Sequence, residues 1–210
     1  MAVTGLIMIA FLLMHMYGNL KAFMGAEAFD HYAHWLKSDI LYPILPKGWF
    51  IWVFRFGLVA AVVLHIWSAA SLSVKTLADR GPKYVNYKRQ AQTYSARTMR
   101  WGGVIVLAFL IFHLIQFTIV PGSFGGDAAS PYTMLIASFT QVWMVALYAV
   151  CMVLVCMHVR HGFWSAFTTL GANTSANARK WLNILAIIVA VALFVGFMSM
   201  PVAVLFGAIS

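Results

Sequence analysis

Four histidines lie in four different long apolar segments of the chain: His15, His65, His113 and His158. Ionisable side chains are costly inside a lipid bilayer, so those that occur there usually mark a pathway or a cofactor. Two imidazoles that face each other across a helical bundle can bind a haem iron from both axial sides, and such a six-coordinate iron is suited to electron transfer. One histidine on each of four membrane helices therefore predicts two stacked haems, each held by two histidines.

The composition indicates that lipid is the main solvent of this chain. Of its 210 residues, 63% are hydrophobic and 9% are charged, whereas a soluble domain has about a quarter charged. We therefore expect an all-α integral membrane protein with a single membrane domain, residues 1–210. The lysines and arginines form no basic polar surface of the size of a nucleic-acid groove, so nucleic-acid binding is excluded.

Five segments have the roughly 20 mostly apolar residues that a transmembrane helix needs. They are residues 1–23, 49–77, 99–120, 132–165 and 181–206. A membrane β-barrel would show short alternating strands instead, so a bundle of five transmembrane helices is the predicted architecture.

The connections and the N-terminal region add two further expectations. The segment 26–37, between the first two spans, has the pattern of a short helix that lies along the membrane interface. Met1 leads directly into an apolar run without a basic stretch or a small-residue cleavage site, so we expect no secretory signal.

Basic residues predict the orientation of the bundle. The connection between the second and third spans, with its edges, carries Lys75, Arg80, Lys83, Lys88, Arg89, Arg97 and Arg100. The connection between the fourth and fifth spans carries Arg179 and Lys180, whereas the one between the third and fourth has neither lysine nor arginine. The positive-inside rule then predicts a cytoplasmic N-terminus and an external C-terminus.

The helix directions predict which histidines meet on the outer side. The first and third helices run outward, and each residue of a helix adds about 1.5 Å. His15 then lies about 21 Å from Met1, and His113 lies about 18 Å from Trp101. Because these depths agree, we expect His15 and His113 to form a pair on the outer side of the membrane midplane.

The remaining two histidines are expected to pair nearer the cytoplasm. His65 lies about 24 Å from Trp49, and His158 lies about 39 Å from Tyr132, which is a weaker match in depth. His161 shares a helix face with His158 and is an alternative fourth ligand. His158 is favoured because it lies deeper in the apolar stretch.

Arg55 is a second costly residue, inside the second apolar segment. It lies about 15 Å on the outer side of His65. We expect its guanidinium to meet a propionate of the outer haem or a quinone carbonyl, and snorkelling to the nearby interface is the alternative.

Four stretches carry a resemblance to a known family. They are TGLIMIAFLLMHMYGNLKAF around His15, AFDHYAHWLK after it, FRFGLVAAVVLHIWSAASL around His65 and HVRHGFWSAFTTLG around His158. Over almost its whole length, the chain resembles the five-helix, dihaem cytochrome b (b558-type) membrane-anchor subunit of bacterial succinate dehydrogenase and fumarate reductase. The stretches HMYGNLK and HGFWSAFTTLG are the most specific.

The resemblance implies a set of ligands and partners. His15 and His113 would bind one haem b, and His65 and His158 would bind the other. The subunit would anchor a flavoprotein with FAD and an iron–sulfur protein with its clusters on the cytoplasmic face of the bacterial plasma membrane. Electrons from succinate would reach a quinone, with menaquinone the expected type, and the basic second-to-third connection would hold the iron–sulfur subunit. The direction of the reaction in vivo and the assembly of complexes into a trimer stay open.

A quinone site near the outer haem would need proton donors, because quinone reduction takes up protons together with electrons. The candidates are Glu27, Asp30, His31 and His34. For each of these residues, a solvated position in the connection is the alternative.

Two other functions compete with this hypothesis. One is the membrane cytochrome b of another respiratory oxidoreductase, of the formate dehydrogenase or nitrate reductase type. Those proteins commonly place two ligands on one helix, whereas no apolar segment here has two histidines half a membrane apart. The other is a haem-free transporter with a histidine proton relay. No flavin or nucleotide motif occurs in the chain, so succinate oxidation itself is expected on a partner chain.

Overall fold

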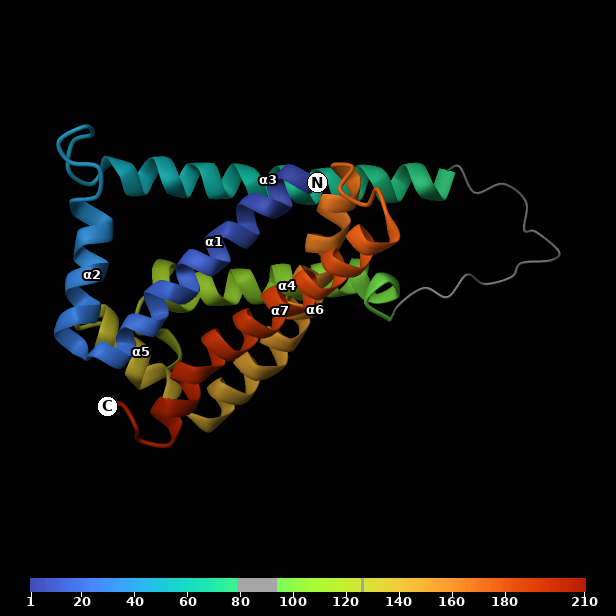
Figure 1. Cartoon of the computed structure of the whole chain (residues 1–210). Helices are drawn as coiled ribbons and strands as arrows, with labels where there is room; N and C mark the ends of the chain where they lie inside the picture. Colours follow the sequence, from blue (N-terminus) through green and yellow to red (C-terminus); the bar gives the residue numbers. More distant parts are fainter. Residues whose placement is uncertain (79–93, 126) are drawn as a thin grey trace.

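The regular elements of this protein are helices throughout the part that the computed structural model describes, residues 1–78, 94–125 and 127–210 (Figure 1). In chain order they are α1 (Ala2–Leu20), η1 (Lys21–Met24), α2 (Ala26–Ser38), α3 (Trp49–Ala78), α4 (Tyr94–Leu114), η2 (Ile115–Ile119), η3 (Ser123–Gly125), α5 (Pro131–Phe139), α6 (Val142–Thr169) and α7 (Ala176–Leu205). Five helical stretches in these ranges are long and apolar enough to cross a membrane: Ala2–Met24, Trp49–Lys75, Trp101–Ile119, Val142–Thr169 and Ala176–Leu205. The expected all-helical, multi-pass membrane protein is therefore confirmed.

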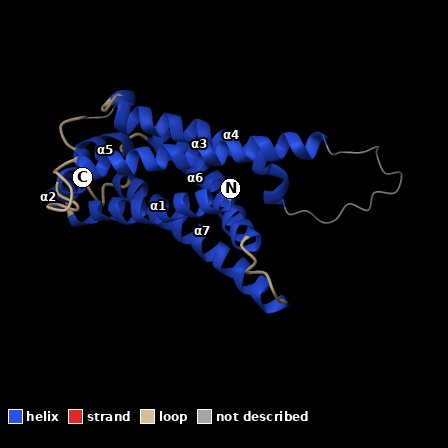
Figure 2. Ribbon diagram, turned by 90° about the horizontal axis from the view of Figure 1, so that it is seen from above, coloured by secondary structure: helices blue, strands red, loops and turns tan. Residues whose placement is uncertain are grey.

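Helix α6 is the centre of the bundle. It packs against α7, α4 and α1, whereas α3 packs against α1 and α2 along one edge (Figure 1). The buried residues of α6 recur at steps of three and four, as in Tyr148, Cys151, Val155 and Val159. This spacing keeps one face of a helix turned toward its neighbours. Both views place α2, α5 and the C-terminus together, and we call this end of the molecule the α2–α5 end (Figures 1 and 2).

The outer surface of the bundle is apolar. On α3, the side chains of Phe56 and Trp67 are 69% and 67% exposed, and Val142 on α6 is 69% exposed. A soluble protein of this size would not present long helices covered with large exposed apolar groups on this scale. Hydrocarbon is the solvent that suits such a surface, because helices satisfy their own backbone hydrogen bonds.

The fourth predicted span, residues 132–165, is wrong at its start, because two helices occupy this region. Ser130 caps α5: its hydroxyl accepts a hydrogen bond from the Thr133 N–H at 3.2 Å, and Pro131 occupies the first turn. The helix ends at Phe139, and Gln141 has extended backbone angles (φ −90°, ψ 115°) before α6 begins. The Gln141 amide donates to the Phe124 carbonyl at 3.1 Å, which stabilises the break.

The other predicted spans overlap observed helices, with differences at their ends. Helix α4 begins at Tyr94 and α7 at Ala176, each five residues before the predicted start of its span. Helix α6 ends at Thr169, four residues beyond the predicted end. The connecting helix predicted over 26–37 is present as α2, with Phe29 as its buried residue.

Gly196 allows α7 to approach α1 closely. A Cβ atom at Gly196 would overlap the Met16 sulfur and lie 2.7 Å from Met16 Cγ. We expect Gly196→Ala to force Met16 out of its position and to destabilise the bundle by about 1–3 kcal/mol. The measurement is the thermal midpoint of the purified protein in detergent.

Gly162→Ala is the matched control, because a Cβ on Gly162 would meet nothing within 4 Å. That variant should be at least as stable as the wild type, since alanine favours a helix more than glycine does. Equal thermal midpoints for Gly196→Ala and Gly162→Ala would contradict the close packing of α1 on α7, because both variants gain the helix preference of alanine.

Candidate functional site

The four intramembrane histidines form two pairs across the bundle. The ring centroids of His15 on α1 and His113 on α4 lie 5.9 Å apart, and the ring planes are 81° apart. The ring centroids of His65 on α3 and His158 on α6 lie 6.3 Å apart, with the planes at 62°. The structure thus brings together the histidines that helix direction pairs in the sequence. Among the described residues, the ring facing His65 is that of His158 and not that of His161.

The corrected start of α6 explains the depth of the His65–His158 pair. Counted from Val142, His158 lies about 24 Å along its helix, and His65 lies about 24 Å from Trp49. The two helices run from the same end of the bundle, so the rings reach the same level. The weak match expected from the sequence came from counting α5 as part of the span.

The two pairs are stacked along α1. The Thr4 hydroxyl lies 3.2 Å from His65 Nδ1, and Thr4 precedes His15 by eleven residues on the same helix. Eleven residues of helix correspond to about 16 Å. The pairs therefore occupy two separate levels of one bundle.

The spacing within each pair fits two imidazoles that share one metal ion. A metal–imidazole bond is about 2 Å long and a ring centre lies about 1 Å behind its nitrogen, so two axial rings have centres about 6 Å apart. The observed values of 5.9 Å and 6.3 Å are close to this spacing, which is also within the range of ordinary ring contacts. Neutral imidazole is also the donor that haem iron takes from histidine. The residues present therefore fit a bis-histidine haem at each level.

A hydrogen-bond chain fixes the protonation of His113. Its Nδ1 lies 3.0 Å from the Tyr148 hydroxyl, which donates its proton to Gln116 Oε1 at 2.8 Å. Since a tyrosine hydroxyl has one proton, its oxygen must accept from His113, whose Nδ1 therefore carries hydrogen. The Nε2 atom of His113 keeps its lone pair, which is the form that binds a metal.

Thr4 does the same for His65. The Thr4 hydroxyl donates to the Met1 carbonyl at 3.0 Å, so its oxygen accepts the hydrogen bond from His65 Nδ1. The His65 Nε2 atom is again left with its lone pair. His158 differs, because its buried Nδ1 has no hydrogen-bond partner in the part of the chain that the structure describes.

Aromatic side chains enclose the His15–His113 pair. Phe11 stacks on His15 with 5.4 Å between ring centroids, and Phe197 lies 5.7 Å from the same ring. Phe117 lies 5.2 Å from the ring of His113. An apolar enclosure of this kind limits the access of water and lowers the local dielectric constant. Both effects change the redox potential of a centre bound there.

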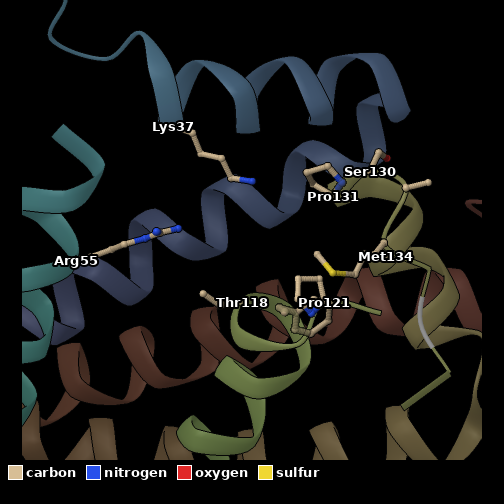
Figure 3. Close-up of a pocket in the computed structure, with 10 residues that line it drawn as sticks. Lys37, Arg55, Thr118, Pro121, Ser130, Pro131 and Met134 are labelled. Atoms are coloured by element: carbon tan, nitrogen blue, oxygen red, sulfur yellow. The ribbon is translucent and has the colours of Figure 1, made fainter. Parts of the chain in front are cut away.

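A cavity of about 320 Å³ opens beside this pair at the α2–α5 end (Figure 3). Lys37 from α2 and Arg55 from α3 point into it, and Phe117 links it to His113. The other lining residues are Thr118, Pro121, Ala128, Ala129, Ser130, Pro131 and Met134. The arrangement offers two positive charges beside apolar walls, and it suits a flat ligand with a polar oxygen at its edge. The sequence reasoning identified Arg55 but missed Lys37, because only the folding of α2 against α3 brings the two together.

The four residues predicted for quinone protonation do not line this cavity. They are Glu27, Asp30, His31 and His34. The Asp30 carboxylate accepts a hydrogen bond from the Tyr132 N–H at 2.9 Å, so it caps the start of α5. His34 lies 3.5 Å from Asp39, and Glu27 and His31 are exposed on α2. The structure does not gather these four side chains into one site.

The predicted docking segment for the iron–sulfur subunit falls mostly outside the described residues. Arg80, Lys83, Lys88 and Arg89 all belong to the stretch 79–93.

The geometry defines a multi-pass helical membrane protein with two stacked histidine pairs. Comparisons with models of known protein families, with curated proteins and with solved structures find no match.

Proposed function

We propose that the chain is the membrane-anchor cytochrome b subunit of a succinate:quinone oxidoreductase of the bacterial plasma membrane. It would carry electrons from an iron–sulfur subunit through two haems b to menaquinone. The proposal is based on the two stacked histidine pairs, whose ring centroids lie 5.9 Å and 6.3 Å apart. Haem iron held by two imidazoles supplies one-electron transfer.

The residues of the chain would serve this function by binding and orienting. His15 with His113, and His65 with His158, would hold the two groups at different depths. The hydrogen bonds to His65 and His113 keep the metal-binding nitrogens of those two residues unprotonated. The phenylalanines around His15 and His113 would exclude water from that level.

The proposed orientation puts the α2–α5 end outside and the opposite end in the cytoplasm. It is supported by the basic residues at the opposite end, which include Lys75, Arg160, Arg179 and Lys180. At the α2–α5 end, the positive charges of the lysines and the arginine are balanced by four carboxylates: Glu27, Asp30, Asp39 and Asp127. The flavoprotein and the iron–sulfur protein would bind on the cytoplasmic side, and the quinone would bind near the outer pair.

The cavity at the α2–α5 end is the best-supported place for the quinone. Phe117, Pro131 and Met134 offer apolar surface to a quinone ring, and Arg55 and Lys37 offer positive charge to its carbonyl oxygen. Loss of a charged hydrogen-bond partner costs about 1.5–3 kcal/mol. We therefore expect Arg55→Gln to raise the quinone KM about tenfold or more while both haems stay bound.

Lys47→Gln is the matched control for Arg55→Gln. It removes a positive charge at the same end of the bundle, but Lys47 pairs with Asp39 at 3.2 Å and does not line the cavity. Its quinone KM should equal that of the wild type. If Arg55→Gln changes a haem midpoint potential and leaves the KM unchanged, Arg55 belongs to a haem propionate instead.

The test of the proposed function is purification of the chain from its native membrane together with its partner chains. We expect a flavoprotein and an iron–sulfur protein to copurify, and succinate to reduce a b-type α band in the visible spectrum. Partner chains of a formate dehydrogenase or nitrate reductase would favour that competing class. A protein without a b-type α band would contradict both cytochrome hypotheses and leave the histidine-relay transporter.

A further inference from the structure

Gln116 is a polar residue in the apolar interior, at 1% exposure. It lies in the π-helical turn η2, which directly follows the helix that carries His113. A π-helical turn holds more residues than an α-helical one, and such turns occur frequently at functional sites. An amide without partners would be costly at this position. Both polar atoms of the Gln116 amide are used, since Oε1 accepts from Tyr148 and Nε2 donates to the Met144 sulfur at 3.6 Å.

We infer that Tyr148 and Gln116 are positioning residues for His113, and that they set how tightly and at what midpoint potential the His15–His113 pair holds its haem. This inference rests on the proposed function, in that the pair binds haem. It adds a role for two residues that themselves touch neither the haem iron nor the quinone. The Tyr148 hydroxyl donates its one hydrogen to Gln116 Oε1. Its oxygen can then only accept a hydrogen bond from His113 Nδ1–H.

The hydrogen bonds from His113 to Tyr148 and from Tyr148 to Gln116 have a predictable effect on His113 as a metal ligand. A hydrogen bond accepted from Nδ1–H makes the imidazole a stronger electron donor and fixes the plane of its ring. A stronger donor stabilises the oxidised iron relative to the reduced iron. Loss of the hydrogen bond should therefore raise the midpoint potential of this one haem and weaken its binding.

Tyr148 and Gln116 serve one level of the bundle, whereas Thr4 is the partner of His65 Nδ1 at the other level. The Nδ1 atom of His158, the second histidine of that level, is buried and has no hydrogen-bond partner among the described residues. Tyr148 and Gln116 lie next to His113, and in the described part of the chain neither makes a ring contact or hydrogen bond with His65 or His158. A change at Tyr148 should therefore alter one haem and spare the other.

Tyr148→Phe is the variant that isolates the hydroxyl. The ring of Tyr148 packs on Phe139 and Phe109, with centroid distances of 4.9 Å and 5.1 Å, and phenylalanine keeps these contacts. In the purified complex, a redox titration followed by visible absorbance should show one haem shifted to a more positive midpoint potential. Transfer of haem to apomyoglobin should be about tenfold faster for that haem. The other haem should keep its potential and its release rate.

Tyr132→Phe is the matched control. Tyr132 is also a buried tyrosine with a hydrogen-bonded hydroxyl, which donates to the Ser210 carbonyl at 3.2 Å, but it lies on α5. Both midpoint potentials should be unchanged in this variant. A second variant, Gln116→Leu, removes the acceptor that directs the Tyr148 proton, and it should shift the potential of the same haem.

The outcomes separate the inference from the proposed function. If the wild-type complex has two haems and neither Tyr148→Phe nor Gln116→Leu alters a potential or a release rate, the positioning role is overturned and the cytochrome remains. If Tyr148→Phe fails to assemble, the result for Gln116→Leu decides. If the wild-type complex has no b-type haem, the proposed function is overturned and the inference with it.

Discussion

Replacing His113 with alanine should remove one of the two haems and leave the other in place. The ring of His113 faces that of His15 at 5.9 Å, so the loss of one imidazole would leave the proposed haem of that level with one histidine to hold it. The second level, formed by His65 and His158, lies about 16 Å away along α1 and shares no ligand with the first. The haem content per chain, measured as the pyridine haemochrome, should fall from about two to about one.

Two further variants sharpen this result. His15→Ala should remove the same haem as His113→Ala, and the double variant should lose no more than either single one, because both residues serve one site. His34→Ala is the control, since His34 is exposed and lies beside Asp39 at 3.5 Å. Retention of both haems in His113→Ala would refute the assignment of that pair.

Replacing His158 with alanine should remove the other haem and stop the reduction of quinone by succinate. The His65–His158 pair lies at the end of the bundle proposed to face the iron–sulfur subunit, so every electron would have to pass this level first. Haem content should again fall to about one per chain. Quinone reduction should be lost, even though the cavity proposed for the quinone, at the far end of the bundle, is intact.

His161→Ala is the matched control, because His161 lies one turn further along α6 and its ring does not face His65 in the described structure. This variant should keep both haems and most of its turnover. The opposite pattern, with His161→Ala losing a haem and His158→Ala retaining it, would make His161 the fourth ligand.

The sequence predicts the membrane class and the histidine pairs because both depend on local properties. Hydropathy and length identify helices that cross a bilayer, and the alternating directions of successive helices set the depths of His15 and His113. The break at Thr140 and Gln141 was missed because apolar residues continue on both sides of it. The polar pair Thr140–Gln141 and the Ser130–Pro131 start signal for α5 are the local features that indicate it.

The surroundings of the histidines depend on contacts between distant segments. Tyr148 contacts His113 from another helix, 35 residues away in the sequence. The contact depends on how α6 is rotated about its axis, and the hydrophobic periodicity of the sequence does not predict that rotation. Lys37 and Arg55 line the same cavity because α2 packs against α3. Asp30 has the chemistry of a proton donor, yet the structure gives it the Tyr132 N–H as a partner. Residue type alone does not distinguish these roles.

The most direct test of the account is a density map of the protein purified from its native membrane with its partner chains. The account predicts two porphyrins, one with its iron between His15 and His113 and the other with its iron between His65 and His158. A map in which these four imidazoles contact only protein or lipid would contradict it.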